Sequence, residues 1–262
     1  MGAILGVEDL QLSFGGLTAL AGVSFEVAPG TIHALIGPNG AGKTSTLNCI
    51  NHFYTPTAGR VRFEGRDITA LASHRVASLG IARTFQNIEL FRGMTVLDNI
   101  KLGRHLHMRV GPLAALVYYG RARREEMHHR RLIEERVIDL LELEDVRDHI
   151  VGSLPYGTQK RVELGRALAM DPKLLLLDEP ATGMNVEETQ FLVRYVLDVR
   201  EAWNVTILLI EHDMRVVMDI SDRVTVMDFG RVIADGPPGV VQRDPAVIRA
   251  YLGEKRDGEH PA

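Results

Sequence analysis

A glycine-rich loop constrains the fold of this chain more than any other feature. The stretch GPNGAGKT at residues 37–44 matches the pattern G-x-x-x-x-G-K-[ST]. It follows an apolar run at residues 31–37 that predicts a strand, and it precedes a segment that predicts a helix. Glycines in such a turn let backbone N–H groups surround a phosphate, and the positive end of the helix faces the same anion. The sequence therefore predicts a nucleoside triphosphate site at this loop.

Two side chains of the loop have separate expected roles. Lys43 should reach the β- and γ-phosphates, and the Thr44 hydroxyl should bind Mg²⁺. The expected ATP-binding residues of the loop are Gly37, Pro38, Asn39, Gly40, Ala41, Gly42, Lys43 and Thr44.

A second motif places two carboxylates at the end of a buried strand. The run LLLLDEP at residues 174–180 has four apolar residues before Asp178 and Glu179. Ligands of α/β sheets bind at the carboxyl ends of strands, so Asp178 is expected to hold Mg²⁺, directly or through water. Glu179 should orient or deprotonate the attacking water. The chain has no Asn-Lys-x-Asp sequence, so guanine recognition of the GTPase kind lacks its usual residues.

Short apolar runs alternate with helical patterns along the chain. The runs at residues 31–37, 174–179, 205–212 and 223–227 are typical of strands buried on both faces. Alternating apolar and polar residues predict a small antiparallel sheet from residues 10–16, 22–30 and 59–68. The predicted fold class is α/β, a P-loop NTPase core with a mostly parallel sheet, an antiparallel β edge sheet and an inserted α-helical lobe.

The expected organisation is one domain over residues 5–254. A helical lobe is expected at about residues 95–165, where strand patterns are missing and residues 121–144 are strongly amphipathic. Its charge run is typical of a solvated helix face. The last residues, 255–262, are polar and predict a disordered tail.

Composition excludes several classes of function. The net charge is −4, so no overall positive field exists to hold a nucleic acid backbone. The uncharged apolar stretch at residues 110–120 is shorter than the ~20 residues that a membrane-spanning helix needs. A membrane role therefore requires a partner. The single cysteine, Cys49, cannot form an internal disulfide, which fits a reducing compartment and a small buried side chain.

Taken together, these motifs resemble the ATP-binding subunits of ABC transporters, over about residues 7–254. The resemblance implies roles for four further residues. Gln86 matches the glutamine that touches Mg²⁺ and the attacking water beside the membrane subunit, and His212 matches the switch histidine at the γ-phosphate. Phe14 matches the aromatic that stacks on adenine, and Asn185 stands where the family has an aspartate in the loop crossing to the other subunit. Taken singly, Phe14 also fits a core aromatic, Gln86 a surface amide and His212 a helix cap.

Within this family, the chain is most similar to the ATP-binding subunits of branched-chain amino acid importers. The stretches FGGLTAL, RTFQNIELFRGMTVLDNI, TILLIEHDM and DPAVIRAYLGE carry that similarity. Importers of urea or short amides share much of it, and lipopolysaccharide-export ATPases share the YLGE ending.

The signature turn departs from the family pattern. SLPYGTQKR at residues 153–161 stands where a Ser-Gly-Gly-Gln turn is usual, so Pro155 removes both a hydroxyl and an N–H. A Tyr-Gly pair is common here in the branched-chain branch, so only Pro155 and Thr158 remain unusual. The resemblance implies that the turn acts on the partner's ATP through Leu154, Pro155, Tyr156, Gly157 and Thr158, together with Asn185.

The resemblance also implies the partners and the location of the chain. ATP and Mg²⁺ bind between two ATP-binding subunits, the second being usually a different homologue in this branch, with a homodimer as the alternative. The resemblance implies that the pair of subunits is peripheral, lies at the cytoplasmic face of the inner membrane and drives membrane permease subunits. A periplasmic solute-binding protein is an indirect partner, because it contacts the permease. Three alternatives are a urea or amide importer, a soluble ABC ATPase of translation or DNA repair, and a non-hydrolysing regulatory subunit. A single phosphate loop argues against the second, and the intact Lys43, Glu179 and His212 argue against the third.

Overall fold

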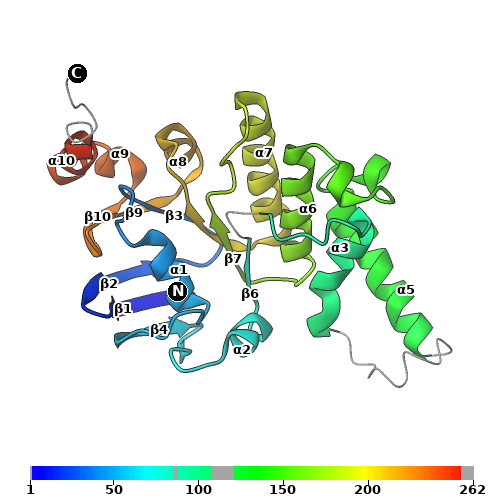
Figure 1. Cartoon of the computed structure of the whole chain (residues 1–262), viewed down its shortest axis with the longest axis horizontal. Helices are drawn as coiled ribbons and strands as arrows, with labels where there is room; N and C mark the ends of the chain where they lie inside the picture. Colours follow the sequence, from blue (N-terminus) through cyan, green and yellow to red (C-terminus); the bar gives the residue numbers. More distant parts are fainter. Residues whose placement is uncertain (1, 85–87, 108–120, 255–262) are drawn as a thin grey trace.

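The computed structural model describes residues 2–84, 88–107 and 121–254, and a six-stranded sheet lies at the centre of this part (Figure 1). Its strand order is β10-β9-β3-β8-β7-β6. The neighbours from β9 to β6 pair in parallel, and β10 joins β9 antiparallel. The strands are β3 (Ile32–Ile36), β6 (Ile81–Arg83), β7 (Leu174–Asp178), β8 (Thr206–Ile210), β9 (Arg223–Asp228) and β10 (Arg231–Gly236). The predicted α/β fold with a mostly parallel sheet is confirmed.

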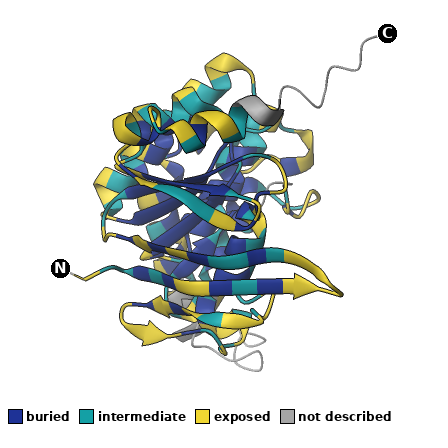
Figure 2. Ribbon diagram, turned by 90° about the vertical axis from the view of Figure 1, so that its left-hand side faces the viewer, coloured by how far each residue is buried: buried dark blue, intermediate teal, exposed yellow. Residues whose placement is uncertain are grey.

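The apolar runs are continuous because the central sheet is covered on both faces. Every residue of β3, β7 and β8 is buried (Figure 2). Leu175 and Leu177 of β7 pack with helices α6 and α7, whereas Leu174 and Leu176 pack with α1 and the antiparallel sheet. Adjacent residues of one strand therefore belong to two different hydrophobic cores.

The antiparallel strands form a sheet of their own, in the order β2-β1-β4-β5. These strands are β1 (Leu5–Phe14), β2 (Leu17–Val27), β4 (Ala58–Phe63) and β5 (Arg66–Asp67). The sheet buries its apolar side chains in the same core as Leu174 and Leu176, so it covers a face of the central sheet instead of extending one edge. The alternation of apolar and polar residues along these strands shows which side chains are buried, but not against which part of the fold the sheet packs.

Helices surround the sheets and continue into a helical region that Figure 1 shows beyond β6 and β7. The helices near the sheets are α1 (Lys43–Ile50), α2 (Ser73–Ser78), α7 (Val186–Trp203), α8 (Met214–Ile220), α9 (Pro238–Val241) and α10 (Pro245–Glu254). The helical region contains α3 (Val96–Gly103), α5 (Arg121–Ile133) and α6 (Tyr156–Leu168), with short helical turns η1 (Arg104–His107), η2 (Glu134–Ile138), η3 (Glu144–Val146) and η4 (Val151–Ser153). Residues 108–120 and the predicted disordered tail, 255–262, lie outside the described residues. In the described part, no helix combines the length and apolarity needed to cross a membrane.

A chain of polar groups, buried at His33 and Thr225 and partly exposed at Asp235, joins β3 to β9 and β10. Nε2 of the fully buried His33 lies 2.7 Å from Thr225 Oγ1, and that hydroxyl donates to Asp235 Oδ1 at 3.0 Å. Since the hydroxyl proton is used on Asp235, we assign the ring proton of the neutral imidazole to Nε2. Nδ1 is buried and has no hydrogen-bond partner among the described residues, so a proton there would be unsatisfied. Burial lowers the pKa of His33 to about 4, although Asp235 opposes this shift.

We expect this histidine to make the free energy of unfolding depend on pH. The pKa of His33 is lower in the folded chain, so its stabilising contribution is complete above its ordinary value of 6.5 and is lost as pH falls toward about 4. The loss amounts to about 3 kcal/mol. Urea unfolding of the wild type and of His33→Leu across this range measures it. The variant should show a shallower pH dependence, and identical slopes for the two proteins would contradict the assignment.

Candidate functional site

The glycine-rich loop connects the buried strand β3 to helix α1. Gly37 has φ +149°, and a Cβ atom there would lie 2.1 Å from the carbonyl oxygen of Met227 on β9. No side chain fits at that distance, so the loop can pass β9 this closely only with glycine at position 37. The sequence motif therefore reflects packing against the sheet as well as access to a phosphate.

Lys43 lies across the loop that it follows. Its Nζ donates to the carbonyl oxygens of Gly37 at 2.6 Å and Pro38 at 3.0 Å, and the residue is only 7% exposed. Gly42 occupies the N-cap position of α1, where no described side chain caps the helix and the first turn contains no acidic residue. An ammonium group and uncapped backbone N–H groups thus lie at one point of the structure, which favours an anion there.

The loop forms one wall of a cavity of about 390 Å³. The rest of the cavity lining comes from three other parts of the chain, namely the start of β2, the residue after β7 and the β9–β10 turn. The lining residues are Leu17, Thr18, Ala19, Asn39, Gly40, Ala41, Gly42, Lys43, Thr44, Ser45, Glu179 and Phe229. The structure therefore brings Glu179 to the loop, as the two motifs together predict.

Asp178 ends β7 as an almost fully buried carboxylate. Its Oδ2 accepts a hydrogen bond from an Arg83 guanidinium nitrogen at 2.7 Å, and Arg83 also donates to Asn48 Oδ1 on α1 at 2.7 Å. Asp178 Oδ1 is buried and has no hydrogen-bond partner within the described part of the chain. One oxygen is thus held in place while the other keeps its lone pairs, which fits a carboxylate that binds Mg²⁺ directly or through water.

Glu179 adopts a left-handed backbone conformation, with φ +47°, directly after the strand. This conformation is uncommon for a residue with a side chain and is held by a hydrogen bond from Glu179 N to the carbonyl oxygen of Ile210 at 2.9 Å. The Thr182 hydroxyl donates to Glu179 Oε2 at 3.2 Å. The turn therefore places Glu179 in the cavity wall, where the Thr182 hydroxyl contacts its carboxylate.

His212 follows β8 with a side chain that is 62% exposed. The cap of α8 is Asp213, which accepts from Arg215 N, so the alternative role of His212 as a helix cap is wrong. Beside it, Glu211 is 1% exposed and accepts from Ala181 N at 3.0 Å and from His212 N at 3.1 Å. Burial raises the pKa of Glu211, and the backbone hydrogen bonds oppose this effect.

Of the three remaining predicted nucleotide contacts, Phe14 and His212 do not line the cavity, and Gln86 cannot be placed. Phe14 is 48% exposed, so it is not a core aromatic, and its ring meets that of Tyr54 edge to face at 5.1 Å. Phe14 pairs across the β1–β2 hairpin with Leu17, which lines the cavity. Gln86 lies outside the described residues. His212 is not among the described residues that line the cavity.

The signature turn begins helix α6. Pro155 is its N-cap, and no described side chain caps the helix. Tyr156 donates from its hydroxyl to the carbonyl oxygen of Thr182 at 3.1 Å, and the Thr158 hydroxyl accepts from Arg161 at 3.3 Å. A Cβ atom on Gly157 would lie 2.8 Å from Glu188 Oε1, so the Glu188 side chain on α7 lies directly against this glycine. The Leu154 carbonyl accepts from the Gln159 side chain at 2.8 Å.

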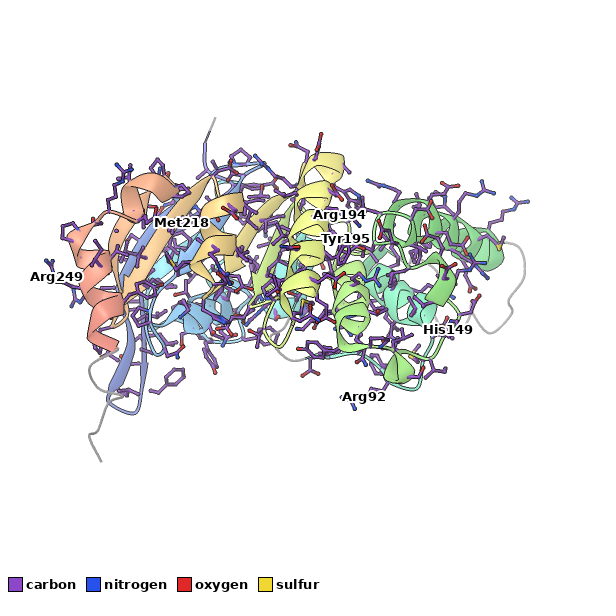
Figure 3. All side chains as sticks on the ribbon, turned by 90° about the horizontal axis from the view of Figure 1, so that it is seen from above. Arg92, His149, Arg194, Tyr195, Met218 and Arg249 are labelled. Carbon is purple, nitrogen blue, oxygen red and sulfur yellow. The ribbon has the colours of Figure 1, made fainter. Side chains whose placement is uncertain are left out.

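Three of the signature residues line a second cavity, of about 290 Å³, that shares no lining residue with the first. Pro155, Gly157 and Thr158 form one wall, and α7 supplies Tyr195, which Figure 3 labels beside Arg194. Asn185 is the N-cap of α7, where its side chain accepts from Glu188 N and Glu188 reaches back to Asn185 N. The side-chain oxygen that the resemblance directs toward a second subunit thus also caps a helix of its own chain.

Several site residues escape prediction from the sequence. Leu17 and Phe229 line the phosphate-loop cavity although they are 72% and 86% exposed. In the sequence, each is a large apolar residue next to a glycine, and this is the only indication that it lies in an exposed turn. Arg83 and Glu211 act through contacts with residues far away in the sequence, which no local pattern reveals.

Comparison with known proteins agrees with these observations. The model of the ABC transporter family matches residues 20–182, and a model described as branched-chain amino acid ATP-binding cassette transporter matches residues 231–257. The high-affinity branched-chain amino acid transport ATP-binding protein BraF of Pseudomonas aeruginosa is 42% identical over 254 residues, which cover 96% of this chain and 98% of that protein. The corresponding protein LivG of Escherichia coli is 41% identical with the same coverage. A probable LivG of Methanocaldococcus jannaschii is 35% identical over 257 residues.

Solved structures give the same result for the fold. A nucleotide-free ATP-binding cassette from an ABC transporter superposes with a TM-score of 0.82 and 34% identity, covering 95% of this chain and 98% of the other. The ADP conformation of an ATP-binding cassette superposes with a TM-score of 0.83 and 35% identity, covering 97% and 100%. Together with the loop, the cavity that it forms with Glu179, and the buried Asp178 beside it, these matches show that the chain belongs to the ABC transporter family.

Proposed function

We propose that this chain binds and hydrolyses ATP and couples the reaction to the import of branched-chain or other hydrophobic amino acids. The observation that carries the proposal is the cavity in which the phosphate loop meets Glu179, while the signature turn of the same chain lines another cavity. Because the signature turn does not line the cavity of its own phosphate loop, it is available to contact the nucleotide on the phosphate loop of a second subunit. The solute class rests on the names of the relatives and on the family match at residues 231–257.

The chain's own residues divide the work on ATP. Lys43 exchanges its bonds to the loop carbonyls for bonds to the phosphates, while the N-terminus of α1 holds the same charge. Thr44, Asp178 and Gln86 are proposed to hold Mg²⁺, which supplies positive charge at the β- and γ-phosphates. Glu179 lies in the cavity wall, from which it can orient or deprotonate the attacking water.

Adenine and γ-phosphate contacts complete the proposed site. Phe14 stacks on adenine at the cavity edge, and the exposed His212 reaches the γ-phosphate when two cassettes close on the nucleotide. The second cassette contributes donors at the N-terminus of its signature helix, so closure depends on the triphosphate. In this branch, we propose a different homologous cassette as the partner, with a homodimer as the alternative.

We place the contact with the membrane permease on the face that carries Phe91 and Ile150. These side chains are 58% and 45% exposed, and their two segments are joined by a hydrogen bond from Gly152 N to the Arg92 carbonyl oxygen. Figure 3 labels Arg92 and His149 on this side of the helical region. The complex is proposed to lie at the cytoplasmic face of the inner membrane, with a periplasmic binding protein delivering the solute on the other side.

Glu179→Gln tests the assigned role of the carboxylate. The amide keeps the size and the hydrogen bond from Thr182 but cannot take a proton, so ATP turnover should fall at least about 100-fold. ATP affinity should change by less than about twofold, because the loop and Lys43 are untouched. Phosphate release and binding of a fluorescent ATP analogue measure the two quantities. Glu201→Gln on the exposed end of α7 is the matched control, and undiminished phosphate release in Glu179→Gln would refute the role.

Pro155→Ser tests the signature turn. Serine restores both a hydroxyl and an N–H at the uncapped start of α6, so turnover at the paired site should rise about two- to fivefold. Pro155→Ala restores only the N–H and should give a smaller increase. The measurement is ATP turnover in the assembled transporter. Equal rates in all three proteins would show that this position makes no contribution to the partner's ATP.

The solute class is tested in the complete transporter. We expect the chain to copurify with permease subunits, and its ATP turnover to rise at least about threefold with a binding protein loaded with leucine, isoleucine or valine. A binding protein loaded with urea or acetamide should have little effect. Stimulation by urea alone would replace the solute class, and purification without any membrane protein would count against the transporter role.

A further inference from the structure

A threonine that follows the catalytic motif contacts the carboxylate of that motif. The Thr182 hydroxyl donates to Glu179 Oε2 at 3.2 Å, and Thr182 N donates to the Glu179 carbonyl oxygen at 3.2 Å. The backbone bond forms a tight turn that places the hydroxyl beside the carboxylate. A donor in this position restricts the orientations of the carboxylate.

The turn is supported from the signature helix. The Tyr156 hydroxyl donates to the Thr182 carbonyl oxygen at 3.1 Å. The Tyr156 ring also lies against Gly183, because a Cβ atom built on that glycine would meet ring atoms at 3.4 to 3.6 Å. One side chain from the first turn of α6 therefore contacts the two residues that follow Ala181.

The turn is also held from the central sheet. Glu211 Oε1 accepts from Ala181 N at 3.0 Å, and the Ile210 carbonyl oxygen accepts from Glu179 N at 2.9 Å. Residues 179–183 thus lie between β8 on one side and α6 on the other. A movement of α6 relative to the sheet would act on this turn first through Tyr156.

We propose that Thr182 is a positioning residue for Glu179 and that Tyr156 holds Thr182 in position. The inference rests on the proposed function, in which Glu179 acts on the chain's own ATP and the signature turn acts on the partner's ATP. Tyr156 belongs to the signature turn, so the contacts from Tyr156 through Thr182 to Glu179 connect the two nucleotide sites within a single subunit. Tyr156 stands where the usual signature turn has a glycine, and its side chain supplies the contact with Thr182.

Two substitutions at Thr182 test the positioning role. Thr182→Val keeps the shape and removes the hydroxyl, so kcat for ATP hydrolysis should fall about five- to twentyfold while KM stays within about twofold. Thr182→Ser keeps the hydroxyl and loses only a methyl group, so kcat should stay within about twofold of the wild type. Equal loss of activity in the two variants would indicate a packing role and overturn the proposal, as would a Thr182→Val variant with unchanged kcat.

Tyr156 is tested by its coupling to Thr182. Tyr156→Phe removes the hydroxyl and keeps the ring against Gly183, so kcat should fall about two- to fivefold. The double variant Tyr156→Phe/Thr182→Val should be no slower than Thr182→Val within about twofold, because Tyr156 acts through Thr182. Fully multiplicative losses would show that Tyr156 affects turnover by another route and would overturn its assigned role.

The same assays separate this inference from the proposed function. A full-length wild-type protein that binds ATP but has no turnover in the assembled transporter would refute the ATPase function itself. An active wild type with an unaffected Thr182→Val variant would refute only the positioning role. Thermal unfolding of each variant shows whether it is folded, and Thr182→Ser, with its intact hydroxyl, keeps the comparison decisive if Thr182→Val is destabilised.

Discussion

The buried ion pair between Arg83 and Asp178 is the interaction on which the geometry of the site depends. The two side chains are 6% and 2% exposed and lie 2.7 Å apart. Two charges at this depth are stable only together, and removal of one would leave the other uncompensated at a cost of several kcal/mol. Arg83 also donates to Asn48, so one guanidinium joins β6, β7 and α1. Because α1 starts at Lys43, this contact sets the position of the phosphate loop relative to the carboxylates.

The parts of the fold that the sequence predicts are those whose physical cause is local. Strands β3, β7 and β8 are buried on both faces, so each is a continuous apolar run, and the loop after β3 has a pattern that backbone geometry requires. Asp178 and Glu179 follow the same logic, because they end a buried strand. The separate layer formed by the antiparallel strands could not be predicted, since alternation shows which side chains are buried but not against what.

The contacts that the sequence does not predict join distant segments. Arg83 reaches Asp178, Glu211 reaches Ala181, and Tyr156 reaches Thr182, and none of these pairs belongs to one periodic element. The resemblance identifies Tyr156 as a feature of one branch but does not show what its hydroxyl contacts. Pro155 and Thr158 are similar cases, because the turn remains the start of a helix although its usual serine and glutamine are replaced.

The Lys43 ammonium group binds to the backbone of the phosphate loop. The ammonium group is bound by two carbonyl oxygens of the loop that it follows, so the loop keeps its curvature by means of a charge from its own sequence. A binding anion must compete for that ammonium group against two dipoles already in contact with it. In the proposed function, a polyphosphate brings more negative charge to this competition than a singly charged anion does. Under that proposal, discrimination among anions begins as an exchange of hydrogen-bond partners at the Lys43 ammonium group.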